Sequence, residues 1–446
     1  MKQAICKLLL LFLFFQFTGV TLSAQSGKKI LIPQKQAKED NYDDPESRFN
    51  HKYKAESKNF VVFWDKSFGL DPTTYSDESR RFNPKEFLKE GERFFAYYRD
   101  KLKFVDKKRS NLKKYKMIIY MYNDAETTAY GWGADEVGIM WFRPTRIQKY
   151  PFCALAHEMA HSFQFMVAAD GHKGYGGHSI IEYCAQWMLW QVYPEWTTIE
   201  NYHLKSYMDK THFALMHRTN QYHAPQMMEY WSNKHGLDII GRMWRGTKAD
   251  EDPVTTYQRL TKLSQQQFND EVYDAATRFV TWDIPRIRKV CAQYANQHHS
   301  KLDKLGNFWY QIAKTRCPQN YGYNAIQLEV PQKGGEVTLD FKGIAGNKEF
   351  GTLYSERAGW RYGFLAVKKN GKRVYGKMNI GKNGENETVR FDVPKDTEYL
   401  WLVVTGAPTQ HTKHLREKSD EVYEEWPYQI RLAGTSPCSA VLEAKK

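Results

Sequence analysis

The sequence predicts an α+β fold, in which a mixed region of strands and helices precedes an all-β domain. In the first half of the chain, three short runs rich in β-branched and aromatic residues occur among apolar residues at helical spacing. From residue 325, short alternating runs separated by turn residues take over, a pattern typical of a β-sandwich. With 446 residues, the chain is long enough to bury a core in each domain.

The N-terminal residues have the pattern of a secretory signal peptide. Lys2 and Lys7 form a basic head, residues 8–17 are apolar, and small and polar residues follow up to Ala24. We therefore expect residues 1–24 to be cleaved near Ala24 and the protein to be secreted or periplasmic. The apolar run is short for a membrane span and no second one follows, so we expect no transmembrane anchor.

Residues 25–57 are polar and predict a leader or an arm that wraps around the next domain, which we place at residues 58–316. Strands are expected in that domain at residues 59–64, 117–122 and 137–142, with a turn at residues 131–133. The expected helices are an amphipathic one at residues 84–104, two short ones at 151–168 and 179–193, and a mostly helical region over 200–315.

The β-sandwich is expected at residues 325–436, with the domain boundary at residues 316–325. Cys317 and Cys438 bracket this region, and a disulfide could join its ends. Its aromatic residues allow two interpretations, a glycan-binding platform or an ordinary sandwich core, and the core is the commoner fate of such residues. The residues concerned are Trp360, Tyr362, Trp401 and Trp426.

The net charge of +14 allows attraction to anionic envelope polymers or acidic substrates, but a lysine-rich solvated surface is the favoured explanation. The sequence contains no nucleic-acid-binding motif, and export argues against such a partner. We therefore expect no nucleic acid among the partners of this protein.

The segment His157-Glu158-Met159-Ala160-His161 matches the H-E-x-x-H pattern. Positions i and i+4 lie on one face of a helix, so His157 and His161 can direct their imidazoles at the same ion. Glu158 lies beside them, where its carboxylate can take a proton from a metal-bound water. The motif therefore predicts a hydrolytic Zn²⁺ site.

A hydrolytic zinc site usually has three protein ligands, and the third must come from outside the motif. Gln164 and Val167 stand where a metzincin would carry Gly and His, which excludes that pattern. Asp170 lies in the loop after the predicted helix. Glu182 lies on the next predicted helix and is the favoured ligand, although Ser179 and Glu182 also fit a capping box.

The stretch from His157 to Glu182 resembles the gluzincin zinc metallopeptidases, in which a glutamate on the following helix completes the metal site. The chain is also similar to a group of secreted proteins of Bacteroides-like bacteria with a C-terminal β-sandwich. The resemblance implies a zincin-like domain and peptide hydrolysis, with residues 137–142 as the sheet edge that holds an extended peptide. Gln186 departs from the pattern, because gluzincins often have an acid there that orients a zinc histidine.

The expected reaction is hydrolysis of a protein or glycoprotein substrate, with Glu158 as general base. Tyr222 and His223 are the candidates for stabilising the oxyanion, and Tyr175 and His178 compete with them. The alternative function is an inactive zincin scaffold that acts as a secreted glycan-binding or adhesion protein. Possible glycan contact through the C-terminal domain is compatible with the peptidase and with the inactive scaffold.

Overall fold

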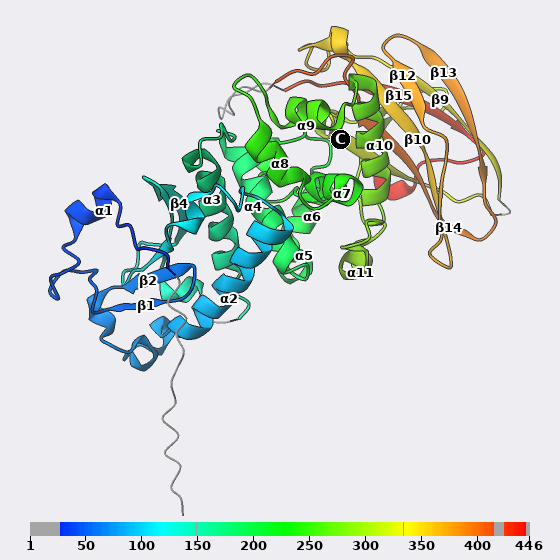
Figure 1. The fold of residues 1–446 in the computed structure, drawn as a ribbon. Helices are drawn as coiled ribbons and strands as arrows, with labels where there is room; N and C mark the ends of the chain where they lie inside the picture. The colour runs from blue at the N-terminus through cyan, green and yellow to red at the C-terminus, as the bar shows by residue number, and fades with distance from the viewer. Residues whose placement is uncertain (1–26, 148–149, 333, 414–422, 443–446) are drawn as a thin grey trace, which may run out of the picture.

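The structure is a computed structural model that describes residues 27–147, 150–332, 334–413 and 423–442 (Figure 1). The expected signal peptide, residues 1–24, lies outside this part of the chain. The predicted α+β class is confirmed, because helices and largely antiparallel sheets occur together. No helix among the described residues is long and apolar enough to cross a membrane.

The first sheet has five strands in the order β1-β2-β3-β5-β4, in which β2, β3 and β5 are parallel and the two outer strands are antiparallel. Their bounds are β1 Lys54–Glu56, β2 Phe60–Trp64, β3 Met117–Met121, β4 Ala129–Ala134 and β5 Val137–Phe142.

Two expectations about this sheet are wrong. Residues 131–133 form part of strand β4 instead of a turn, and β5, expected at the edge, is an inner strand between β3 and β4. The turn prediction is wrong because the glycines of this segment allow β4 to pack closely against α3 and do not mark a turn. A Cβ at Gly131 would lie 1.9 Å from the carbonyl oxygen of Glu158, and one at Gly133 would overlap Phe165.

Helices and the N-terminal arm cover the two faces of this sheet. On one face, β2 and β3 direct alternate residues into the main core with helices α2 Pro84–Ala96 and α3 Cys153–Ala169. On the other face, Tyr42 and Phe49 pack against the remaining strand residues, and the Tyr42 hydroxyl bonds to that of Tyr120 at 2.7 Å. The residues before β1, which include helix α1 Gln34–Glu39, thus form an arm on the sheet.

A helical region follows the sheet. Its helices are α4 His178–Val192, α5 Trp196–Ile199, α6 Asn201–Asp209, α7 Gln226–His235, α8 Ile239–Gly246, α9 Pro253–Thr261, α10 Gln265–Phe279 and α11 Arg288–Cys291. Figure 1 shows α10 lying along the strands of the C-terminal domain. This helix therefore links the two halves of the molecule.

The C-terminal domain consists of two sheets with a shared core. One sheet holds β8 Tyr323–Leu328, β10 Gly359–Lys368, β11 Arg373–Tyr375, β12 Asn379–Lys382 and β14 Thr397–Gly406. The other holds β6 Leu302–Lys304, β7 Trp309–Ile312, β9 Gly335–Gly343, β13 Asn386–Val393 and β15 Tyr428–Ala433. The sandwich thus begins at Leu302 and not at residue 325, because β6 and β7 extend its second sheet.

The aromatic residues considered for a glycan platform lie in the interior. Trp360, Tyr362 and Trp401 are 0% exposed and Trp426 is 1% exposed. Alternate residues of β10 and β14 face the sandwich core and the helical region, so these strands are buried on both faces. The core interpretation is correct, and these residues offer no glycan surface.

The disulfide considered between Cys317 and Cys438 is not formed. Both residues belong to or contact the sandwich core, but each is a free cysteine. Cys153, Cys184 and Cys291 are free and buried as well. In the described part of the chain, packing without cross-links therefore holds the domains together.

Candidate metal centre

Helix α3 is fixed on three sides, which sets the direction of its histidines. The hydroxyl of Tyr98 donates to the carbonyl of Ala156 at 2.9 Å, and that of Ser162 donates to the carbonyl of Ile139 in β5 at 3.0 Å. Strand β4 lies directly against the backbone of Glu158, where only Gly131 fits. The helix begins at Cys153, two residues later than the sequence predicts.

Three side chains from α3 and α4 converge on one point. His157 Nε2 lies 3.1 Å from His161 Nε2 and 3.1 Å from Glu182 Oε2, and His161 Nε2 lies 3.4 Å from the same oxygen. Ligands bound tetrahedrally at zinc distances would lie about 3.3 Å from one another. The cluster therefore has the spacing that a tetrahedral ion requires, and among the described residues it is the one group of His, Cys, Asp or Glu with such geometry.

The capping-box alternative for Glu182 is wrong. Helix α4 begins at His178 with Gly177 as its N-cap, so Glu182 is the fifth helical residue and not the third. A side chain at that position cannot reach back to the N-cap amide. Its carboxylate is instead directed at the two histidines.

Gln164 holds His161 in place, a role that the sequence did not suggest. Its Oε1 lies 3.0 Å from His161 Nδ1, and its Nε2 donates to the carbonyl of Ile181 in α4 at 2.9 Å. Because the amide NH₂ must face the carbonyl, Oε1 must accept from Nδ1–H. In the neutral imidazole, His161 Nε2 then carries the lone pair that a metal ligand needs, and in the protonated imidazole it donates to Glu182.

Hydrogen bonds and opposite charges link the three side chains of the cluster. Burial raises the pKa of Glu182, but hydrogen bonds from His157 and His161 outweigh it and hold the pKa well below its usual range. Burial lowers the pKa of His161, but the hydrogen bond to Glu182 and the charge of Glu158 outweigh it and raise the pKa. The half-buried carboxylate thus favours a positive charge at this point, either a proton or a metal ion.

Tyr222 and His223, the two candidates for stabilising the oxyanion, differ in their contacts with the cluster and in their hydrogen bonds. The Tyr222 ring lies 6.3 Å from that of His157, and burial together with the charge and hydrogen bonding of Glu182 raises the Tyr222 pKa to about 12. Its hydroxyl is therefore a proton donor at neutral pH. Gln186 Nε2 donates to the Tyr222 carbonyl at 3.1 Å, so this amide supports the tyrosine and not a zinc histidine.

His223 bonds away from the cluster through one nitrogen. Its Nδ1 lies 2.7 Å from Nδ1 of His203, whose Nε2 lies 3.4 Å from Glu200. The contact between the two rings uses Nδ1 of both, so one ring donates and the other accepts, and His223 Nδ1 is not available to the cluster. Burial lowers the pKa of both histidines, that of His203 to about 4.

The remaining sequence candidates take other positions. Asp170 accepts the backbone N–H of Asn111 at 2.8 Å and belongs to no described metal cluster. Tyr175 packs edge-on against Trp244 and lines a cavity beside the start of α4. The side chain of His178 lies outside the described part of the structure.

A family model described as "Family of unknown function (DUF6055)" matches residues 22–439. The chain belongs to this family. The match extends over the metal cluster and both domains of this DUF6055 protein. No curated protein matches it.

This chain is only weakly similar to solved protein structures. A functionally unknown conserved protein from Bacillus anthracis str. Ames is 11% identical, with 56% of this chain and 49% of that chain covered and a TM-score of 0.28. The C-terminal family 22 carbohydrate binding module of Clostridium thermocellum Xyn10B is 10% identical, with 30% and 74% covered and a TM-score of 0.18.

Proposed function

We propose that this protein is a secreted, zinc-dependent peptidase of the gluzincin type. The convergence of His157 Nε2, His161 Nε2 and Glu182 Oε2 at 3.1–3.4 Å carries the proposal. These three side chains would hold Zn²⁺, and bound zinc would supply an acidified water and polarise a carbonyl group. The donor set of two imidazoles and one carboxylate is one that catalytic zinc uses.

Strand β4 supports this function by its place at the sheet edge. It runs along α3 at Glu158, and its other edge has no partner strand in the described sheet. An extended peptide can add to such an edge through backbone hydrogen bonds. Tyr130 and Trp132 on β4 are 63% and 41% exposed and offer contact to substrate side chains. We therefore place the substrate along β4 instead of β5.

Glu158 is the proposed general base and later the acid that protonates the leaving amine. Tyr222 is the proposed oxyanion donor, because its hydroxyl is protonated, 39% of the residue is exposed, and it lies beside the cluster. His223 is less suited to that role, because its Nδ1 bonds to His203 and not to the cluster. An inactive scaffold would need neither a base nor a donor at these positions, so we favour the enzyme.

The first experiment measures the zinc content of the purified protein and of two variants, Glu182→Ala and Glu158→Gln. We expect about one zinc per chain in the wild type and in Glu158→Gln. Glu182→Ala should lose most of the zinc, because only two ligands remain. Hydrolysis of unfolded protein substrates should be lost in both variants. A wild-type protein without zinc after growth in zinc-supplemented medium would contradict the proposal.

A further inference from the structure

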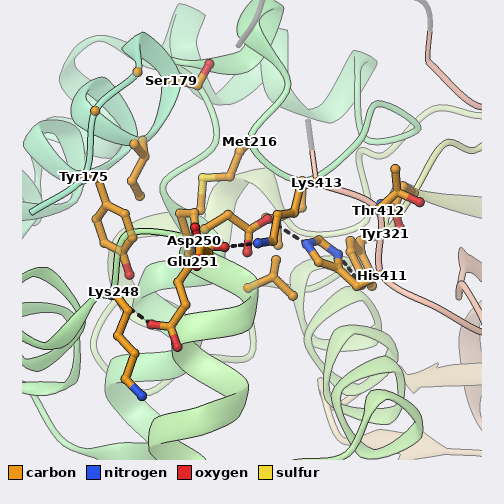
Figure 2. Close-up of a pocket in the computed structure, with 18 of the residues that line it drawn as sticks. Tyr175, Ser179, Met216, Lys248, Asp250, Glu251, Tyr321, His411, Thr412 and Lys413 are labelled. Atoms are coloured by element: carbon orange, nitrogen blue, oxygen red, sulfur yellow. Dashed lines mark hydrogen bonds and ion pairs between the residues drawn. The ribbon is translucent and has the colours of Figure 1, made fainter. Parts of the chain in front are cut away.

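A cavity of about 870 Å³ lies between the two domains, beside the metal cluster and not over it. Its walls come from the loop before α4, the connection between α8 and α9, and two segments of the C-terminal half around Tyr321 and His411. Figure 2 shows Tyr175 on one side of the cavity and Tyr321 and His411 on the other. The volume is within the range of small-molecule sites.

Two chain segments connect this cavity with the metal cluster. Ile180 lines the cavity, and Glu182 follows it by two residues on α4. Met216 also lines the cavity, and the same segment reaches the cluster six residues later at Tyr222. Because positions i and i+2 of a helix do not face the same side, α4 lies between the cavity and the cluster, and the cavity is a separate compartment next to the proposed active site.

The cavity wall contains two buried polar atoms without a hydrogen-bond partner, Tyr175 Oη and Asn320 Oδ1. Tyr175 is 9% exposed and Asn320 is 2% exposed. Burial raises the pKa of Tyr175, and the hydroxyls of Thr256 and Thr247 are close enough to oppose this shift. These two hydroxyls bond to each other at 3.1 Å, however, and neither reaches Tyr175 Oη with hydrogen-bond geometry. Buried polar atoms are rarely left unpaired in native proteins, so these two indicate a ligand.

The charges of the cavity wall are balanced, because the lining contains Lys173, Lys248 and Lys413 and also Asp250, Glu251 and Asp252. The two less exposed acids are paired within the protein. Glu251 accepts from the guanidinium of Arg259 at 2.5 and 2.7 Å, and Asp252 lies 2.6 Å from His411 Nε2. Asn320 Oδ1 needs a hydrogen-bond donor, which an anionic ligand group cannot supply. The cavity thus suits an uncharged ligand with several hydroxyl groups.

The neighbouring surfaces favour a sugar over a peptide. Tyr175, Tyr321 and Tyr423 contribute aromatic rings to the lining, and rings of this kind pack against the apolar faces of sugars. No strand edge lines the cavity, so a peptide backbone would find no ladder to join. Tyr321 is fixed by its hydroxyl, which lies 2.9 Å from His411 Nδ1.

We propose that this cavity binds a short, uncharged oligosaccharide. Because the cavity lies next to the cluster, the sugar would be a glycan carried by the peptide that is cleaved. This assignment of the sugar rests on the proposed peptidase function. Glycan recognition then belongs to the interdomain cavity and not to the aromatic residues of the sandwich.

The test measures binding without turnover, in the zinc-loaded Glu158→Gln protein. The probes are lacto-N-tetraose, mannotetraose and xylotetraose, with tetragalacturonic acid and tetra-alanine for comparison, followed by calorimetry or ligand-observed NMR. We expect at least one neutral sugar to bind and the acidic sugar and the peptide not to bind.

Tyr175→Phe is the decisive variant, because it removes a hydroxyl that has no partner in the protein. It should weaken sugar binding roughly three- to tenfold and leave folding intact. Tyr273→Phe is its matched control, since the Tyr273 hydroxyl is also buried and unpartnered but does not line the cavity.

The following outcomes would overturn the inference: no neutral probe binds, a charged or peptide probe binds better, or both tyrosine variants weaken binding equally. Sugar binding by a protein that hydrolyses no peptide would overturn the proposed function and the link to a cleaved glycopeptide, but not the sugar site. Peptide hydrolysis by a protein that binds no sugar would overturn only this inference.

Discussion

His161 Nδ1 lies 3.0 Å from Oε1 of Gln164, three residues later on the same helix, and the amide nitrogen of Gln164 bonds to α4. One side chain thus sets the tautomer of a proposed metal ligand and joins the two helices that supply the candidate site. In zinc enzymes this role often falls to a carboxylate or a backbone carbonyl. Here a neutral amide performs it, so the histidine gains orientation without added negative charge.

Replacing this amide should weaken metal binding. We expect Gln164→Leu to raise the zinc dissociation constant roughly 10- to 100-fold, because His161 loses the partner that fixes its ring. Competition with a chromogenic chelator measures the constant. Gln258→Leu is the control, since that helical amide donates to Gln265 and lies outside the described metal cluster. Equal zinc affinity in Gln164→Leu and the wild type would refute a role in orienting the ligand.

The Tyr222 hydroxyl should affect the chemical step and not metal binding. We expect Tyr222→Phe to lower kcat roughly 100-fold, with little change in KM or zinc content. Steady-state kinetics on a peptide substrate together with metal analysis separates these effects. His223→Gln should change kcat less, because His223 bonds to His203 and not to the cluster. A larger loss of kcat in His223→Gln than in Tyr222→Phe would make His223 the oxyanion donor instead of Tyr222.

Gly131 should be essential for the fold around the site. In Gly131→Ala the new Cβ would meet the Glu158 carbonyl at 1.9 Å, so β4 or α3 must move. We expect a loss of about 3 kcal/mol in the free energy of unfolding, as is found for overpacking, and a loss of activity. Urea denaturation measures the first quantity. Gly306→Ala, where a Cβ meets nothing within 4 Å, serves as the control.

A buried neutral histidine should make the fold sensitive to acid. His298 is 5% exposed and its Nε2 lies 2.8 Å from the Tyr323 hydroxyl, and burial lowers its pKa to about 3. The unfolded chain, with a histidine pKa of about 6.5, binds this proton first as the pH falls. Stability from this group is therefore lost between about pH 6.5 and 3, with a slope of up to about 1.4 kcal/mol per pH unit.

His298→Gln should flatten this part of the profile, because glutamine does not titrate. Denaturant unfolding at several pH values between 4 and 7 gives the slopes of both proteins. His299→Gln, at the exposed neighbouring histidine, is the control for general effects of the substitution. Identical slopes in wild type and His298→Gln would show that this histidine does not control acid stability.

The sequence alone determined what depends on local spacing. His157, Glu158 and His161 could be assigned to one helix face because the helical period places positions i and i+4 together. The β-sandwich could be recognised from alternating runs, and the second helix from its apolar pattern. Glu182 was chosen by resemblance, and its contact with the two histidines required the packing of α4 on α3.

Features that depend on contacts between segments far apart in the sequence could be found only in the tertiary structure. Gly131 and Gly133 predict a turn by local preference, yet they form a strand because α3 leaves no room for a Cβ. Gln164 gained its role from the carbonyl of Ile181 on another helix, and the interdomain cavity exists only where the two halves of the chain meet. Local periodicity carries no information about such contacts, because they depend on how whole elements pack against each other.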